Sequence, residues 1–199
     1  SKSSIDQHLA KQIEEIMNEG GIHNINKLLN ILRSILNNQE IKLIDTNLHI
    51  FSDPLQWKWK KEIGNRIGII HYNSLIKAGD TDYATAIEKA VRESGYIPRT
   101  LWVSTLRNKL IQREIINLFL KESISAIITT TSFSAINQEE APLGIELWDS
   151  LGIPVFQLLS SIGSRDKWRN SKLGLNPVDL SLQVVMPEID GRITTRPCA

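Results

Sequence analysis

The chain has 199 residues, a formal net charge of +1, 41% hydrophobic residues and 23% charged residues. This composition indicates a globular protein with enough apolar residues for a core, and it excludes the extended basic surface of a nucleic-acid binder. The single cysteine, Cys198, excludes an internal disulfide framework and a zinc site built on cysteines. No apolar run is long enough to cross a membrane, and we expect a cytoplasmic protein without a secretory signal.

Two amphipathic helices are predicted at the start of the chain. Apolar residues recur at helical spacing over residues 4–17 and again over residues 24–36. Because Gly20-Gly21 separates the two patterns, we expect an antiparallel hairpin. The following residues, up to about 61, lack a clean period. Trp57 and Trp59 in this segment are expected to pack it onto the next domain rather than to form a stacking platform.

Apolar runs alternate with helical patterns from Arg66 onward. The runs cover residues 66–72, 96–103, 125–131 and 153–159, and the helical patterns cover residues 82–94, 110–121 and 143–151. This alternation predicts an α/β fold with an open parallel sheet and helices on both faces, of the flavodoxin- or Rossmann-like kind. We expect a helical hairpin and connector over residues 1–60 and a doubly wound α/β domain over 61–175. Residues 176–199 would hold a helix, an acidic loop and the start of a next, truncated region.

The apolar tail over residues 177–186 is predicted to be a helix rather than a buried strand. An asparagine cap and a proline open it, and its apolar residues follow helical spacing. Pro187 is expected to end this helix. Glu188 and Asp190 would then lie in the loop that follows, and residues 192–195 would begin a new strand.

Ligands of open parallel sheets bind outside the carboxyl ends of the strands. Three predicted loops leave those ends, over residues 71–81, 132–142 and 160–166. The first is long for its type and contains His71, Asn73 and Asp80, which are therefore the candidate ligand-binding residues. His71 is more simply a hydrogen-bonded packing residue than a base, and Asp80 or Thr81 more simply caps the next helix.

Glu188 and Asp190 follow the predicted end of a helix, where the backbone itself carries partial negative charge. Two carboxylates at this place are unfavourable unless a cation compensates them. Arg192 or Arg196 could supply that charge internally. A divalent metal ion could supply it as well, because oxygen ligands suit hard cations. Both alternatives stay open on the residues alone.

Several motifs are more specific than the composition. The tail contains W-x-x-S-x-x-G-L-x-P over residues 168–177 and L-Q-V-x-x-P-E-x-D-G over residues 182–191. Residues 66–103 run from a strand through a long loop and a helix to a second strand, and residues 20–29 carry GG-x-x-N-x-x-x-L-L. Together these stretches resemble the large, tetrapyrrole-binding subunit of the cobaltochelatase (CobN-type) and magnesium-chelatase family. The ending GRITTR resembles the cobalt-type members more than the magnesium-type members.

The resemblance implies a fragment of a very large cytoplasmic subunit that holds a tetrapyrrole macrocycle. That subunit would work with an AAA+ ATPase motor and its integrin-like partner to insert Co²⁺ or Mg²⁺ as substrate. ATP would be used by the partners and not by this chain. The resemblance implies Glu188 as the catalytic, metal-handling carboxylate and Asp190 as the second acid. Further site residues would lie outside the fragment, which we expect to be inactive alone.

Two other interpretations remain from the residues. A stand-alone flavodoxin-like or periplasmic-type domain would bind a small ligand through residues 71–81 without a metal. A purely structural scaffold domain would connect other parts of a large protein.

Overall fold

The computed structural model describes residues 7–39, 48–133, 135, 146–160, 165–172 and 174–198. The chain divides into two compact units, and each is described by itself. The first unit contains Ser1–Ser52 and Ser74–Thr81, and the second contains Asp53–Asn73 and Asp82–Ala199. Among the helices of the described residues, none has the length and apolar character needed to cross a membrane.

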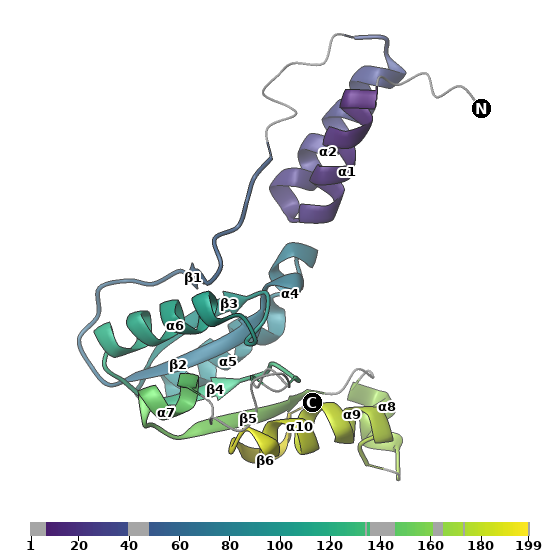
Figure 1. Cartoon of the computed structure of the whole chain (residues 1–199). Helices are drawn as coiled ribbons and strands as arrows, with labels where there is room; N and C mark the ends of the chain where they lie inside the picture. The colour runs from purple at the N-terminus through teal and green to yellow at the C-terminus, as the bar shows by residue number, and fades with distance from the viewer. Residues whose placement is uncertain are drawn as a thin grey trace. The chain divides into compact units, whose positions relative to one another are not determined.

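The first unit contains the predicted helical hairpin (Figure 1, purple). Its helices are α1 (Gln7–Glu19) and α2 (Ile22–Leu36). Gly21 in the turn has a φ of 85°, and a Cβ atom there would lie 2.7 Å from the ring of Phe51. Only glycine combines this backbone conformation with this close approach, so the turn between the helices depends on it.

A short helix, α4 (Asn73–Ala78), occupies the place where the sequence predicted an open loop over residues 71–81. Its residues Leu75, Ile76 and Ala78 favour a helix, and Gly79 with a φ of 78° ends it. Within the first unit, the Lys77 carbonyl accepts a hydrogen bond from the Gly21 amide at 2.8 Å. The Lys77 ammonium also lies 3.0 Å from the Glu19 carboxylate. The prediction of a loop was therefore wrong.

The described residues of the second unit form a six-stranded, mostly parallel sheet. Its strands are β1 (Leu55–Trp57), β2 (Arg66–Tyr72), β3 (Ile97–Val103), β4 (Ile124–Thr129), β5 (Val155–Ser160) and β6 (Ile193–Cys198). The order is β1-β3-β2-β4-β5-β6, and only β1 runs antiparallel to its neighbour. Counted in chain order, the parallel strands follow the flavodoxin-like order 2-1-3-4-5. The predicted α/β class is confirmed.

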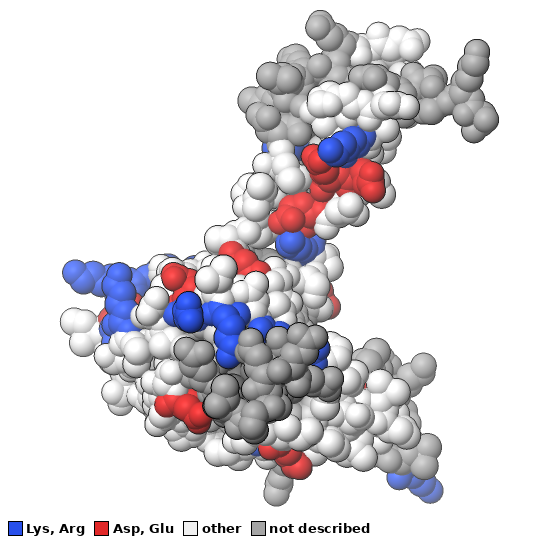
Figure 2. All heavy atoms as spheres, in the orientation of Figure 1, with Lys and Arg blue, Asp and Glu red and all other residues white. Residues whose placement is uncertain are grey.

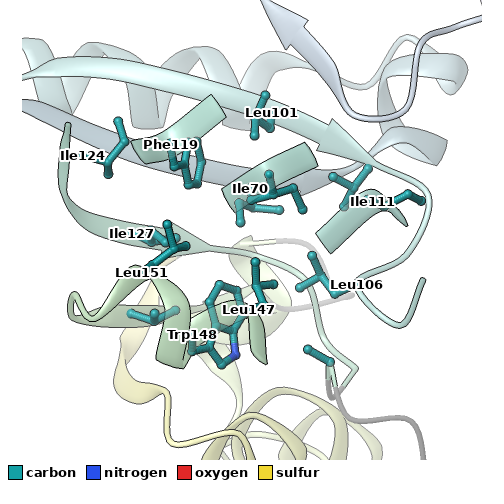
Figure 3. Packing of buried hydrophobic residues seen from close by; sticks show 14 residues of the cluster. Ile70, Leu101, Leu106, Ile111, Phe119, Ile124, Ile127, Leu147, Trp148 and Leu151 are labelled. Carbon is teal, nitrogen blue, oxygen red and sulfur yellow. The ribbon is translucent and has the colours of Figure 1, made fainter. Parts of the chain in front are cut away.

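Helices cover both faces of this sheet (Figure 1). They are α5 (Asp82–Glu93) on one face and α6 (Lys109–Lys121) and α7 (Glu146–Leu151) on the other, and a short helix, α8 (Arg165–Asn170), follows β5. Side chains from β2, β3 and β4 point toward those of α6 and α7 and form the main apolar core, with Ile70, Leu101 and Phe119 among them (Figure 3). On the other face, the Thr100 hydroxyl of β3 donates to the Glu88 carboxylate of α5. The doubly wound arrangement follows from this alternation of faces along each strand.

Strand β1 was missed because three residues are too few to show a period. It pairs with β3, and the Trp57 ring packs edge-on against Trp102 with 5.4 Å between centroids. The indole nitrogen of Trp59 donates to the Thr100 carbonyl at 2.8 Å. Both tryptophans thus pack the connecting segment onto the sheet domain, as predicted. The second unit accordingly begins at Asp53, earlier than the predicted boundary at residue 61.

The tail contributes a strand to the same sheet. Strand β6 pairs in parallel with β5, with Ile193 opposite Phe156. Residues 177–189 before it are helical throughout, as α9 (Pro177–Leu180), a π-helical turn η1 (Ser181–Val185) and α10 (Met186–Ile189). This helix connects β5 to β6 as a further βαβ crossover.

Pro187 does not end the tail helix, in contrast to the prediction. In the π turn, the Met186 amide donates to the Ser181 carbonyl, five residues earlier. This wider turn places Pro187, which has no amide hydrogen, in the first turn of α10, where that hydrogen is not needed. The helix ends instead at Ile189, and Gly191, which has a φ of 72°, reverses the chain just after the cap residue Asp190.

Candidate functional site

The strand order reverses between β2 and β4, and this defines the candidate site. At such a point the loops from neighbouring strands diverge, and ligands bind at the carboxyl ends of the strands. His71 and Tyr72 end strand β2, while Thr130 and Thr131 directly follow strand β4. These residues form the inner wall of the candidate site within the second unit.

His71 is fully buried at the end of β2. Its Nδ1 lies 2.8 Å from the Thr130 hydroxyl, and that hydroxyl is 3.5 Å from the Ile70 carbonyl as a donor. The ring packs against Tyr83 and Trp102, and burial lowers the pKa of His71 to about 3. This geometry is that of a neutral, hydrogen-bonded packing residue.

The structure does not gather the other two ligand-binding candidates of the first loop around His71. Asn73 is half-buried at the start of α4 and is the last residue before the chain enters the first unit. Asp80 is exposed and belongs to the first unit, where its amide donates to the Leu75 carbonyl at 2.9 Å and closes α4. Asn137, Glu139, Glu140 and Ser164, from the other two predicted loops, lie outside the described residues.

Asp190 and Arg192 form a fully enclosed ion pair. Arg192 Nη2 is 2.6 Å from Asp190 Oδ2, and both side chains have 0% exposure. The same carboxylate oxygen accepts a hydrogen bond from the Ala135 amide at 2.7 Å, and the guanidinium lies over the Trp148 ring. Burial is the main influence on Arg192 and lowers its pKa, while Asp190 acts in the opposite direction. Of the two arginines that the sequence offered as an internal counter-charge, Arg192 is the one that pairs with Asp190. The Arg196 side chain lies outside the described part.

Arg192 also fastens the segment that follows β4. Its Nη1 donates to the Thr131 carbonyl at 2.8 Å and to the Gln157 side-chain oxygen at 2.9 Å. Its Nη2 donates to the Phe133 carbonyl at 2.9 Å. One guanidinium thus connects Thr131 and Phe133, which follow β4, with Gln157 of β5 and with the tail.

Glu188 has a different environment from Asp190. It is exposed in the last turn of α10, and its Oε1 accepts a hydrogen bond from the Thr194 hydroxyl at 3.1 Å. The predicted acidic pair is therefore divided into one buried and one solvent-facing carboxylate. The described residues contain no cluster of three or more His, Cys, Asp or Glu that could hold a metal ion. Within this part of the chain, Glu188 could offer a metal ion a single ligand.

Tyr72, Thr131 and Gln157 were not singled out from the sequence. Tyr72 ends β2, and its hydroxyl oxygen accepts a hydrogen bond from the Phe133 amide at 3.3 Å. Burial raises the pKa of Tyr72. Two signals were available, namely the threonine run that closes an apolar strand and a glutamine inside another apolar run. A polar side chain inside a buried strand requires a partner, and here that partner is Arg192.

A cavity of about 270 Å³ lies at the amino ends of the strands, opposite the candidate site. Trp59, Lys60, Lys61, Glu62, Arg66, Arg99 and Glu122 line it. Its two glutamates are paired with arginines, with Arg99 Nε 2.6 Å from Glu122 and Arg92 Nη1 2.7 Å from Glu62. On the face drawn in Figure 2, basic and acidic side chains of the second unit occur in small groups of both signs. This cavity lies at the amino ends of the strands, away from the switch point.

Comparisons with known proteins cover nearly the whole chain. Residues 14–199 match the family model for CobN/Magnesium Chelatase. The aerobic cobaltochelatase subunit CobN of Sinorhizobium sp is 30% identical over 130 residues, which are 65% of this chain and 10% of that protein. The chloroplastic magnesium-chelatase subunit ChlH of Oryza sativa subsp. indica is 26% identical over 131 residues, 63% of this chain and 9% of that protein.

One solved structure extends this similarity to the fold. The catalytic subunit of cobaltochelatase from Mycobacterium tuberculosis superposes with a TM-score of 0.81 at 24% sequence identity. The match covers 98% of this chain and 17% of that chain. The present chain thus spans about a tenth of the length of the curated relatives named above.

Proposed function

The chain belongs to the CobN/magnesium chelatase family, and we propose that it is part of the tetrapyrrole-binding subunit of an ATP-dependent metal chelatase. The complete enzyme would insert Co²⁺ or Mg²⁺ into a corrin or porphyrin ring. The observation that carries this proposal is the family match over residues 14–199, which includes the hairpin, the sheet and the tail helix. The GRITTR ending favours Co²⁺ as the metal.

Glu188 is the residue of this chain that we assign to the chemistry. Insertion of M²⁺ into the free macrocycle forms metal–nitrogen bonds and releases two protons from the pyrrole nitrogens. An exposed carboxylate can replace a water molecule on the arriving metal ion or accept one of these protons. The solvent-facing position of Glu188 and its single hydrogen bond to Thr194 support this role.

Asp190 is assigned a positioning role. Its Oδ2 is engaged by Arg192 and by the Ala135 amide, and its side chain is enclosed. Binding a metal ion there would require the Arg192 ion pair to open. We therefore propose that Asp190 orients Arg192, and that Arg192 holds the segment after β4 against the site.

The remaining parts of the mechanism would be supplied from outside this chain. The metal ion is a substrate, and ATP would be hydrolysed by an AAA+ ATPase motor and its integrin-like partner. The absence of a Walker-type phosphate loop from the sequence supports this division of labour. We expect the 199 residues alone to be inactive, and we expect the assembly to work in the cytoplasm.

The test is metal insertion by the longest natural polypeptide that contains this sequence, assayed with its ATPase partners and saturating tetrapyrrole. Glu188→Gln removes the negative charge and keeps the size, and we expect at least a tenfold loss of kcat. The matched control is Glu114→Gln, which neutralises an exposed acid on α6 and should leave kcat unchanged. Equal rates for Glu188→Gln and the wild type would remove Glu188 from the mechanism.

A further inference from the structure

Helix α2 exposes a continuous apolar stripe. The stripe consists of Ile22, Ile25, Leu29, Leu32 and Leu36, whose exposed fractions run from 40% to 83%. The spacing alternates three and four residues, which is the a/d pattern of a helix that packs against another helix. From Ile22 to Leu36 the helix rises by about 21 Å, which is the length of the stripe. It is therefore a full helix-docking surface rather than a few scattered apolar residues.

The stripe lies on the side of α2 that α1 does not cover. The buried residues of α2 are Asn24 and Ile31, and Ile16 is the buried residue of α1. Asn24 is fixed by hydrogen bonds to the Gly20 and His49 carbonyls, each at 2.8 Å. These contacts hold the rotation of α2 within the first unit. The apolar stripe consequently cannot turn inward without breaking them.

The charge on α2 indicates what covers the stripe. Arg33 lies beside the stripe, whereas Lys27 lies on the opposite face of the helix, and α2 has no acidic residue. A second copy of α2 laid against the stripe would bring a second Arg33 to the interface and no acid. A helix with an apolar a/d stripe and glutamate or aspartate beside it fits this surface in both respects.

The length of the relatives indicates where such a helix comes from. The superposition on the solved cobaltochelatase subunit takes in 98% of this chain, including the hairpin, but only 17% of that subunit. The hairpin is thus kept within a molecule about six times as long. We infer that the α2 stripe docks an acidic-flanked amphipathic helix from another region of the same longer chelatase polypeptide. This inference rests on the family assignment and goes beyond the proposed chemistry.

Cysteine labelling tests the inference without any activity assay. Leu29→Cys places a thiol on the stripe, and Asn30→Cys places one on the adjacent exposed position. Reaction with a maleimide is followed at each cysteine by peptide mass spectrometry, so that Cys198 can remain. In the 199-residue chain, both new thiols should react at rates within twofold. In the longest natural polypeptide, Leu29→Cys should react at least tenfold more slowly, whereas Asn30→Cys should not change.

Three results would overturn the inference. One is equal labelling of Leu29→Cys in the long and short chains, and another is protection already present in the short chain. The third is a dimer of the short chain in sedimentation that Leu29→Glu dissociates, because the occupant would then be a second copy. Leu32→Cys repeats the measurement one turn away and guards against a local disturbance at Leu29. Since metal insertion is not measured, loss of Glu188 function would leave these outcomes intact.

Discussion

A buried arginine lies at each end of the parallel strands. The two ends are called here the amino edge and the carboxyl edge of the sheet, and their arginines have different surroundings. At the amino edge, the Arg99 side chain is 3% exposed while its partners Glu62 and Glu122 are 28% and 24% exposed. At the carboxyl edge, Arg192 and Asp190 are both fully enclosed. Water can therefore replace a lost partner at the amino edge and not at the carboxyl edge. The enclosed pair is bonded to Thr131 and Phe133, which follow β4 at the candidate site.

The largest expected effect comes from breaking the enclosed pair. Arg192→Met leaves Asp190 buried without a counter-charge and should lower the free energy of unfolding by about 3–5 kcal/mol. Urea denaturation at pH 7 measures it, with the tryptophans of the second unit as the probe. A loss below about 1 kcal/mol would show that the carboxyl edge is as open to water as the amino edge.

The second-largest effect is expected from lowering the pH, which should reduce the free energy of unfolding through His71 at the carboxyl edge. Because the pKa of folded His71 is about 3 and that of an unfolded histidine about 6.5, the unfolded chain binds the extra proton. The contribution of His71 to the free energy of unfolding is therefore present above about pH 6.5 and is lost progressively as the pH falls toward 3. Between pH 7 and pH 5 the loss should be about 2 kcal/mol.

His71→Asn separates this term from other pH effects. The amide side chain can still hydrogen-bond to the Thr130 hydroxyl but does not titrate, so the difference in the free energy of unfolding between pH 7 and pH 5 should fall by about 2 kcal/mol. His8→Asn, an exposed change in α1, serves as the control and should keep the wild-type pH dependence. An unchanged pH dependence in His71→Asn would mean that His71 is not held neutral.

A smaller effect is expected from the buried arginine of the amino edge. Arg99→Met should lower the free energy of unfolding by about 1–2 kcal/mol, because Glu62 and Glu122 can turn to water. The comparison with Arg192→Met in the same denaturation experiment is direct, since both changes replace a buried arginine by methionine. Equal losses would contradict the distinction between the edges.

The smallest effect should come from Glu62→Gln, which lies at the rim of the amino edge. The hydrogen bond from Arg92 lowers the pKa of Glu62, so its contribution is present above pH 4.5 and is lost as the pH falls below that value. At pH 7 the change should cost less than about 1 kcal/mol, and about 1 M salt should reduce the difference further. The loss caused by Arg192→Met should not respond to salt.

Local patterns in the sequence were sufficient for most of the sheet domain. Strand β2 has the predicted bounds, and α5 ends within a residue of its prediction, because apolar runs and helical stripes are properties of short segments. Strand β1 could not be found in this way, since its three residues are held by pairing with β3. Strand β6 was recognised as a strand, but its place beside β5 depends on contacts distant in sequence.

The candidate site was less accessible from the sequence. Asp190 and Arg192 are two residues apart, so an internal pair could be considered beside a metal ion. The choice between them depends on Thr131 and Gln157, which lie 61 and 35 residues away from Arg192. The prediction that the helix ends at Pro187 was wrong for a related reason. Proline propensity describes a regular α-helix, whereas the π turn before Pro187 removes the conflict.

The π turn over Ser181–Val185 also shows how the length of the tail can change in evolution. Its five residues close one turn that a regular α-helix closes with four, so losing one of them would leave the residues beyond it facing nearly the same way. Asp190 would still face Arg192, and Glu188 would stay on the side on which Thr194 meets it. Pro187 would then lie inside a regular α-helix, where its ring meets the carbonyl four residues earlier. A natural shortening of this turn should therefore be accompanied by replacement of Pro187.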